Sequence, residues 1–240
     1  MNAALDLGNS RLKLLRSDGA YAAWELPLLD QREIEQLLSP VGRIAVCSVN
    51  PSAERSLVEL LGSRWELLDV RRAIAGGNLP FEVVADGVGA DRILGVLGAL
   101  RYADPPLVVF DFGTATTVTI LDTDRRLVGG YIVPGIGLQL TVLRERLPHL
   151  SVPDSVVGFS TQPGSRTASA IGSGIVLETI AFVGMVVSET KTFVRTPHVS
   201  VIFTGGHVES LREALDRLSI GAAVVPHLVL EGALSLLEER

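Results

Sequence analysis

Cysteine and lysine are both scarce in this sequence of 240 residues, and acidic residues outnumber basic ones. The one cysteine, Cys47, excludes a disulfide framework, and its apolar neighbours predict a buried, unreactive thiol. Only two of the 21 basic residues are lysine, the net charge is −6 and the pI is near 5.3. Because binding to a phosphate backbone needs a basic surface, these values argue against nucleic acid as the main partner, although a local basic patch stays compatible with them.

Several other patterns are missing as well. The four histidines are scattered without metal-ligand spacing, and neither Gly-x-x-x-x-Gly-Lys-Ser/Thr nor Gly-x-Gly-x-x-Gly occurs. The longest apolar run, residues 175–187, contains Glu178 and is too short to span a bilayer, so it predicts a core helix. Asp6 interrupts the N-terminal apolar run too early for a signal peptide. We therefore expect a soluble, cytoplasmic protein that binds no membrane.

Apolar residues are plentiful and follow a repeated pattern. With 47% hydrophobic and 20% charged residues, the chain fits one large domain or two small ones. In the first half we expect strands at 2–7, 11–16, 20–26, 43–49 and 65–69, and helices at 30–38, 51–61 and 91–102. In the second half we expect strands at 107–112, 116–122, 126–132, 199–204 and 222–225, and helices at 136–147, 167–190, 207–217 and from 228.

Each half therefore begins with three strands and continues with alternating helices and strands. This order predicts a mixed sheet covered by helices in each half. Pro105 and Pro106 end a helix and mark the boundary between the halves. We accordingly expect an N-terminal domain at 1–106 and a C-terminal domain at 107–240.

Two glycine turns follow apolar strands, one in each half. The first is Leu-Asp-Leu-Gly-Asn-Ser-Arg-Leu-Lys at 5–13, and the second is Phe-Asp-Phe-Gly-Thr-Ala-Thr-Thr at 110–117. Glycine lets the backbone approach a ligand, small polar side chains donate to phosphate oxygens, and an aspartate can hold a cation or its water shell. Two such turns predict a nucleotide held between two related domains.

Six segments, in this order along the chain, resemble the motifs of one family. They are Asp-Leu-Gly-Asn-Ser-Arg-Leu-Lys (6–13), Gly-Ala-Asp-Arg (89–92), Asp-Phe-Gly-Thr-Ala-Thr-Thr (111–117), Gly-Gly-Tyr-Ile-Val-Pro-Gly (129–135), Thr-Ala-Ser-Ala-Ile-Gly-Ser-Gly (167–174) and Thr-Gly-Gly (204–206). Together they resemble the type III pantothenate kinase family of the acetate and sugar kinase, Hsp70 and actin superfamily. The resemblance covers nearly the whole chain and implies an α/β fold of two related actin-like (ribonuclease H-like) domains.

The resemblance also implies roles for individual residues. Asp91 corresponds to the base that accepts a proton from the pantothenate hydroxyl, and Asp111 to the residue that binds a monovalent cation, potassium or ammonium. The residues implied to bind ATP are Asp6, Leu7, Gly8, Asn9, Ser10, Arg11, Leu12, Lys13 and Thr114, with Gly205 and Gly206 beside the adenine. The residues implied to bind the acid substrate are Gly89, Ala90, Asp91, Arg92 and Thr167. Magnesium would accompany ATP, and the family implies a homodimer.

The chemistry of these side chains fits the implied roles. The ammonium of Lys13 beside a glycine turn can offset charge that grows on a transferred phosphoryl group. Arg92 can bind a carboxylate through two hydrogen bonds, and Asp91 can orient and deprotonate an alcohol.

Each site also has a simpler structural explanation. Asp91 is suited to cap the helix that begins there, and Arg92 to lie on its surface. Asp111 fits an Asx-turn, and Asp6 with Lys13 fits a polar hairpin tip.

Two departures from the family pattern affect the acid-substrate pocket. The family usually has asparagine where this chain has Arg166. It also usually has an aromatic residue several positions before the Gly-x-Asp-Arg motif, where Phe81 is the nearest aromatic and requires a small shift in register. The pocket for the acid is therefore predicted on weaker grounds than the nucleotide site.

The predicted function is ATP-dependent phosphorylation of pantothenate to 4'-phosphopantothenate, the first step of coenzyme A biosynthesis. One alternative is another phosphotransferase or a polyphosphate phosphatase of the same fold. A second is a regulatory accessory factor without catalysis, against which the complete set of Asp6, Lys13, Asp91 and Asp111 argues.

Overall fold

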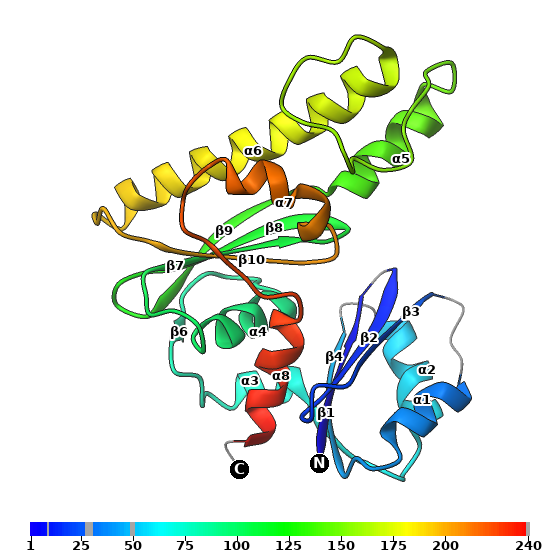
Figure 1. The fold of residues 1–240 in the computed structure, drawn as a ribbon. Coiled ribbons are helices and arrows are strands. Elements are labelled where there is room, and N and C mark those ends of the chain that lie inside the picture. The colour runs from blue at the N-terminus through cyan, green and yellow to red at the C-terminus, as the bar shows by residue number, and fades with distance from the viewer. Residues whose placement is uncertain (9, 27–30, 49–50, 239–240) are drawn as a thin grey trace. The chain divides into compact units, whose positions relative to one another are not determined.

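The computed structural model describes residues 1–8, 10–26, 31–48 and 51–238. Contacts between Cα atoms divide the chain into two compact units (Figure 1). Unit 1 contains residues 1–102 and 227–240, and unit 2 contains residues 103–226. The chain therefore leaves unit 1 once and returns to it for its last helix.

Unit 1 is built on a sheet with the strand order β3-β2-β1-β4-β5. The strands are β1 (Asn2–Leu7), β2 (Arg11–Arg16), β3 (Tyr21–Glu25), β4 (Arg43–Ser48) and β5 (Glu66–Asp69). Strand β2 pairs antiparallel with both β1 and β3, whereas β4 pairs in parallel with both β1 and β5. The helices are α1 (Gln31–Leu38), α2 (Pro51–Leu61), α3 (Val70–Ala75), α4 (Ala90–Ala99) and α8 (Leu228–Glu238), and a short strand, β6 (Glu82–Val83), precedes α4.

The alternation of side chains along β1 gives this sheet two different faces. Leu5 and Leu7 pack with Ile34 of α1 and Leu57 of α2 in one buried apolar cluster. Because successive side chains of a strand point to opposite faces, Asp6 lies on the other face. Helix α8 contacts β1 and β4, and Figure 1 shows it on the side of the sheet away from α1 and α2.

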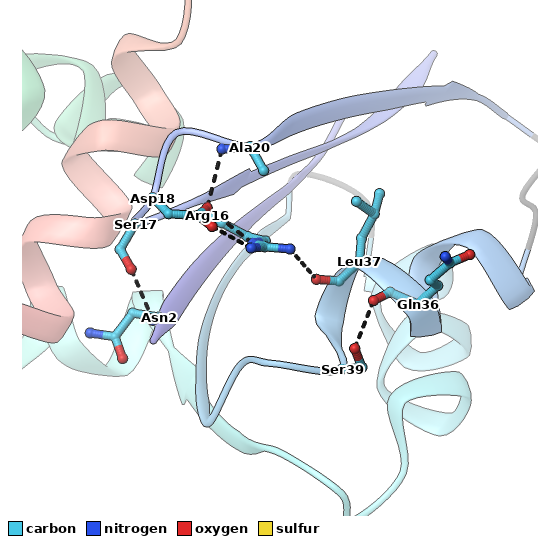
Figure 2. Close-up of polar contacts among 8 residues, drawn as sticks. All are labelled: Asn2, Arg16, Ser17, Asp18, Ala20, Gln36, Leu37 and Ser39. Carbon is cyan, nitrogen blue, oxygen red and sulfur yellow. Dashed lines mark hydrogen bonds and ion pairs between the residues drawn. The ribbon is translucent and has the colours of Figure 1, made fainter.

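The turn between β2 and β3 is tied to the end of α1 by side chains (Figure 2). Arg16 donates to the carboxylate of Asp18 and, through Nη1, to the carbonyl oxygen of Leu37 at 3.2 Å. Asp18 in turn accepts a hydrogen bond from the N–H of Ala20 at 3.2 Å. The turn therefore has a fixed position relative to the helix that covers its sheet.

Unit 2 repeats the strand arrangement of unit 1. Its strands are β7 (Leu107–Phe112), β8 (Ala115–Leu121), β9 (Arg126–Pro134), β10 (Ser200–Thr204) and β11 (Ala223–Val224), in the order β11-β10-β7-β8-β9. Strands β7, β8 and β9 are antiparallel neighbours, and β10 pairs in parallel with β7 and β11. In both units, three antiparallel strands are therefore followed by two parallel ones, with the first strand in the middle. This repeat confirms the predicted α/β fold.

Three helices complete unit 2, namely α5 (Ile136–Arg146), α6 (Thr167–Phe193) and α7 (Val208–Asp216). Within the described residues, one helix, α6, is long and apolar enough to cross a membrane, judged by length and composition alone. Half of its most apolar window is buried within the protein. Ile180 and Val183 of α6 pack in the same buried cluster as Phe110 and Phe203 of the sheet.

The predicted strands and helices are present within the described residues, with ends shifted by at most three positions. The sequence does not predict α3 and β6, because each is too short to show a periodic pattern. The contact units also differ from the domain limits expected at 1–106 and 107–240, since residues 227–240 group with unit 1.

Two glycines explain why the last helix belongs to unit 1. A Cβ atom added at Gly98 of α4 would overlap the carbonyl oxygen of Leu228, and one added at Gly232 of α8 would overlap that of Leu94. The two helices therefore pack backbone against backbone. No local pattern in the sequence indicates this pairing, because the two helices are far apart in the chain.

We expect Gly232→Ala to lower the free energy of unfolding by about 1–3 kcal/mol, since the added methyl group has no space between the helices. Gly184→Ala in α6 is a matched control, because a Cβ atom there meets only Leu218 at an ordinary distance of 3.8 Å. The control should leave stability unchanged or raise it by up to about 1 kcal/mol through helix propensity. Urea unfolding measures both variants. Equal free energies of unfolding for the wild type and Gly232→Ala would contradict the close packing of α4 on α8.

Candidate active site

Asp6 and Lys13 face each other across the first hairpin. They are register partners on β1 and β2, and Nζ of Lys13 lies 3.5 Å from Oδ2 of Asp6. The N–H of Gly8 donates to the carbonyl of Arg11 at 3.0 Å and closes the turn between the strands. The side chain of Asp6 is 12% exposed and that of Lys13 is 33% exposed. Strand pairing therefore puts a carboxylate and an ammonium side by side in a largely buried position.

In this position the ionised form of Asp6 is less favourable than it would be in water. Burial raises the pKa of its carboxyl above the ordinary value, Lys13 opposes the increase, and the carboxylate of Asp91 adds to it. The net increase means that Lys13 does not fully compensate for the loss of solvent. Asp91 is also near enough to Asp6 for their charges to interact. Buried ionisable groups with charged neighbours of this kind are typical of functional sites.

The other predicted ATP-binding residues of this hairpin fall into three groups. Leu7 and Leu12 are buried in the apolar cluster on the opposite face of the sheet, so their side chains are directed away from Asp6. Ser10 and Arg11 are exposed at the turn. Asn9 lies outside the described residues.

Asp91 is in the first turn of α4 but does not cap it. The N-cap residue is Gly89, which has an extended backbone with φ −62° and ψ 147°. A Cβ atom on Gly89 would overlap Oδ1 of Asp91, so the carboxylate occupies the space next to the glycine. Gly89 therefore takes the N-cap position that the sequence allowed for Asp91. Burial lowers the pKa of the half-buried Arg92, and the neighbouring Asp91 opposes that change.

Three residues that belong to none of the sequence motifs lie near this group. The His227 ring stacks on Tyr21 with centroids 3.9 Å apart, and burial lowers its pKa, with Glu231 opposing and Lys13 adding to the decrease. The sequence gives no indication of this contact, because His227 enters unit 1 only with the last segment of the chain.

Cys47 is the register partner of Asp6 on β4 and is buried. The predicted burial of this cysteine is confirmed, and burial raises the pKa of its thiol.

In unit 2, Asp111 lies near the carboxyl end of β7. Its register partners are Thr117 on β8 and Thr204 on β10. A Cβ atom on Gly205 would overlap Oδ1 of Asp111, and one on Gly113 would lie 3.4 Å from it. Gly205 also has φ +100°, which favours glycine for a second reason. The Asp111 carboxylate is thus held between the glycine turns that follow β7 and β10.

Thr114 belongs to the same group of turns. Its carbonyl oxygen accepts a hydrogen bond from the N–H of Gly135 at 3.0 Å, and a Cβ atom on Gly135 would overlap the carbonyls of Gly113 and Thr114. Three glycine-containing segments therefore meet where β7 and β10 end. The carboxyl edge of parallel strands is a common place for nucleotides to bind.

The acid-substrate residue predicted in unit 2, Thr167, is the exposed first residue of α6. The Ser169 hydroxyl accepts from the N–H of Arg166 at 3.1 Å and donates to the Arg166 carbonyl at 2.9 Å. The helix therefore begins normally, although Arg166 replaces the usual asparagine of the family pattern. No described group of three or more His, Cys, Asp or Glu residues is arranged to hold a metal ion.

Structures of known proteins resemble this fold over its whole length. A Baf family protein from Campylobacter jejuni, provisionally described as a transcriptional activator, has a TM-score of 0.65 at 21% identity and covers 99% of this chain and 98% of its own. The archaeal actin homologue Ta0583 has a TM-score of 0.54 at 13% identity and covers 100% of this chain and 99% of its own. At these identities the likeness concerns the fold, which is actin-like.

Sequence comparison gives a closer relationship. A type III pantothenate kinase from Paracoccus denitrificans is 33% identical over 212 residues, which are 84% of this chain and 77% of the relative. One from Pseudomonas aeruginosa is 30% identical over 243 residues, which are 95% of each chain. The sequence model of the type III pantothenate kinase family matches residues 3–189. This chain belongs to the type III pantothenate kinase family.

Proposed function

We propose that this chain transfers the γ-phosphoryl group of ATP to the primary hydroxyl of pantothenate. The product is 4'-phosphopantothenate, and the reaction is the first step of coenzyme A biosynthesis. Family membership supports the pair of substrates. The structural observation that carries the proposal is the grouping of Asp6, Lys13 and Asp91 in unit 1. Transfer to an alcohol needs a base for the hydroxyl proton and a cation beside the phosphoryl group, and this group contains both.

The residues of unit 1 would divide the chemistry between them. Asp91 orients the hydroxyl and accepts its proton while the oxygen attacks the γ-phosphorus. The bond from that phosphorus to the bridging oxygen breaks, and ADP leaves. Lys13 offsets the charge on the transferred group, and Asp6 holds Lys13 in place. Residues Gly89 to Arg92 form part of the pocket for the acid.

Unit 2 would contribute to the nucleotide site. Thr114 contacts ATP, and the turn at Gly205 and Gly206 lies beside the flat adenine. Asp111 supplies a carboxylate oxygen beside the glycine turns, a donor that suits a weakly bound monovalent cation, potassium or ammonium. Magnesium would be held mainly through the phosphates of ATP, as is usual for this ion. Bound ADP in a structure of the actin homologue Ta0583 supports nucleotide binding by this fold.

We further propose a cytoplasmic homodimer, in which each chain has two functional domains with their boundary after residue 106. Leu177 and Met185 are exposed on α6, and exposed apolar side chains of this kind suit contact with a second copy. A regulatory factor without catalysis is disfavoured, because such a protein has no need to bury the carboxylate of Asp6 next to Lys13 and Asp91.

A first test of this proposal separates the function of Asp6 from its effect on stability. Because its folded-state pKa is raised, Asp6 contributes stability in full only below its unfolded pKa of about 4, and the contribution is lost as the pH rises through the folded pKa. We expect Asp6→Asn to be more stable than the wild type at pH 7 and to lose most of its activity. Urea unfolding at pH 7 and pH 4 should give a smaller difference at pH 4. If Asp6→Asn were less stable than the wild type at pH 7, the raised pKa assigned to Asp6 would be contradicted.

The second test concerns the base. Asp91→Asn should lower turnover by roughly 10²- to 10⁴-fold while ATP still binds, which is the usual cost of losing a general base. A coupled ADP-release assay with pantothenate measures turnover, and calorimetry measures ATP binding. Asp86→Asn, which changes an exposed carboxylate in the preceding loop, is the control. Near-normal turnover of Asp91→Asn would eliminate the catalytic role.

The third test concerns the cation. Asp111→Asn should keep the fold, raise the KM for ATP by roughly tenfold or more, and blunt activation by potassium, because a charged contact is lost without a change of shape. Activities in potassium, ammonium, sodium and cation-free buffer give the comparison. Asp154→Asn serves as the control, since its side chain is fully exposed in the same unit. Equal wild-type activity in all four buffers would exclude a functional monovalent site.

A further inference from the structure

A cavity of about 560 Å³ lies in unit 1 between α1 and the segment that joins α2 to β5. Helix α1 lines it with Arg32, Glu35 and Gln36, and the segment after α2 lines it with Arg64 and Trp65. The volume is within the range of about 300–1,000 Å³ that is usual for sites of small molecules.

This cavity is separate from the candidate active site. Helix α1 packs through Ile34 on one face of the sheet, whereas Asp6 lies on the other face. Val41 also lines the cavity and precedes β4, at the amino end of the parallel strands β4 and β1, whereas Asp6 is near the carboxyl end of β1. A ligand in the cavity therefore lies away from Asp6 and its partners in unit 1.

Trp65 gives the cavity an aromatic wall with a fixed orientation. Its Nε1 donates to the carbonyl oxygen of Leu38 at 3.0 Å, and its ring packs against the buried apolar cluster of unit 1. The guanidinium carbon of Arg64 is 5.9 Å from the centre of the ring. Because carbon atoms in contact lie about 3.5–4.0 Å apart, Arg64 does not cover the ring closely. A flat ligand can therefore pack against the indole.

Arg64 is held in the cavity wall by a carboxylate. Its Nη1 donates to Oε2 of Glu35 at 3.0 Å, and Nε2 of Gln31 donates to Oε1 of the same carboxylate at 3.0 Å. The hydrogen bonds from Gln31 and Arg64 lower the pKa of Glu35, which keeps it ionised. A guanidinium has five N–H donors in a rigid plane, so the contact with Glu35 orients Arg64 and leaves further donors for a ligand. Because Arg32 lines the same cavity, its described wall has one more positive than negative side chain.

We propose that this cavity binds a small planar acid, an aromatic ring that carries a carboxylate or phosphate group. The ring packs against the indole of Trp65, and the anionic oxygens accept hydrogen bonds from the guanidinium of Arg64. Arg32 adds to the positive charge that attracts the anion. The site shares no residue with the groups proposed for phosphoryl transfer, so it is independent of the proposed function.

The test uses two probes and two control compounds. Benzoate and phenyl phosphate each join a benzene ring to one of the two anionic groups. Cyclohexanecarboxylate keeps the charge without the flat ring, and benzyl alcohol keeps the ring without the charge. We expect the probes to bind with a Kd of about 1 mM or lower. Cyclohexanecarboxylate should bind about threefold or more weakly and benzyl alcohol about tenfold or more weakly, for want of the ring and the charge respectively.

The two tryptophans of the chain supply the measurement and its internal control. In NMR spectra of the isotope-labelled wild-type protein, each gives one indole N–H signal. Trp24 donates to Glu33 at 2.7 Å and does not line the cavity. Titration with either probe should therefore shift the Trp65 signal and leave the Trp24 signal in place.

Variants of Arg64 test the anion contact. Arg64→Leu should raise the Kd of both probes by about tenfold or more, the usual effect of a lost charged hydrogen bond. Arg64→Lys, which keeps the charge and loses the planar fork, should give a smaller increase. Arg55→Leu is the matched control, because Arg55 is exposed on α2 and does not line the cavity. Melting temperatures and the Trp24 signal report folding, and Arg64→Lys keeps the test valid if Arg64→Leu is unstable.

The outcomes are distinct. A shift confined to Trp65, weakened in Arg64→Leu and unchanged in Arg55→Leu, supports the site, and the tighter probe identifies the preferred anion. The proposal would be overturned by an unshifted Trp65 signal at about ten times the expected Kd of both probes. Equal binding of the probes and the control compounds, or an unchanged Kd in Arg64→Leu, would also overturn it. In each of these cases the kinase function stands, since ADP release with pantothenate is measured separately.

Discussion

The pairing of Asp6 with Lys13 on one face of the first sheet is the constraint around which unit 1 is arranged. In the register of β1 and β2, Asp6 and Lys13 are opposite each other, and Leu7 is opposite Leu12. A slip of one residue would exchange the two faces, so that the carboxylate entered the apolar cluster and a leucine replaced it in the site. The short turn closed by Gly8 therefore fixes the core and the candidate site at the same time.

The two units use the same topology for different chemistry. Asp6 and Asp111 each lie two residues before a glycine, on the central first strand of their sheets. Asp6 is next to an ammonium and is largely buried, whereas Asp111 is next to threonines and to the backbone of Gly205. The fold repeats the position of the carboxylate, and the neighbouring side chains decide what each carboxylate can bind.

The last helix completes unit 1 from the far end of the chain. Its contact with α4 depends on Gly98 and Gly232, and the Tyr102 hydroxyl donates to Glu231 at 2.6 Å near the point where the chain leaves the unit. The same segment brings His227 against Tyr21. Side chains from both ends of the sequence therefore surround the face on which Asp6 lies.

The sequence by itself determined the longer elements, their repeated order and the family, whereas α3 and β6 are too short to be predicted. Alternating and helical periodicities are local, and a glycine turn after a strand and an acid is a local pattern as well, so the strands, helices and both aspartate turns were predictable. Only the tertiary structure decided which residues surround those turns. It placed α8 in unit 1 and gave the N-cap of α4 to Gly89 instead of Asp91. The physical reason is that these arrangements arise from packing between segments distant in the chain or from the exact phase of a helix, and neither leaves a pattern in neighbouring residues.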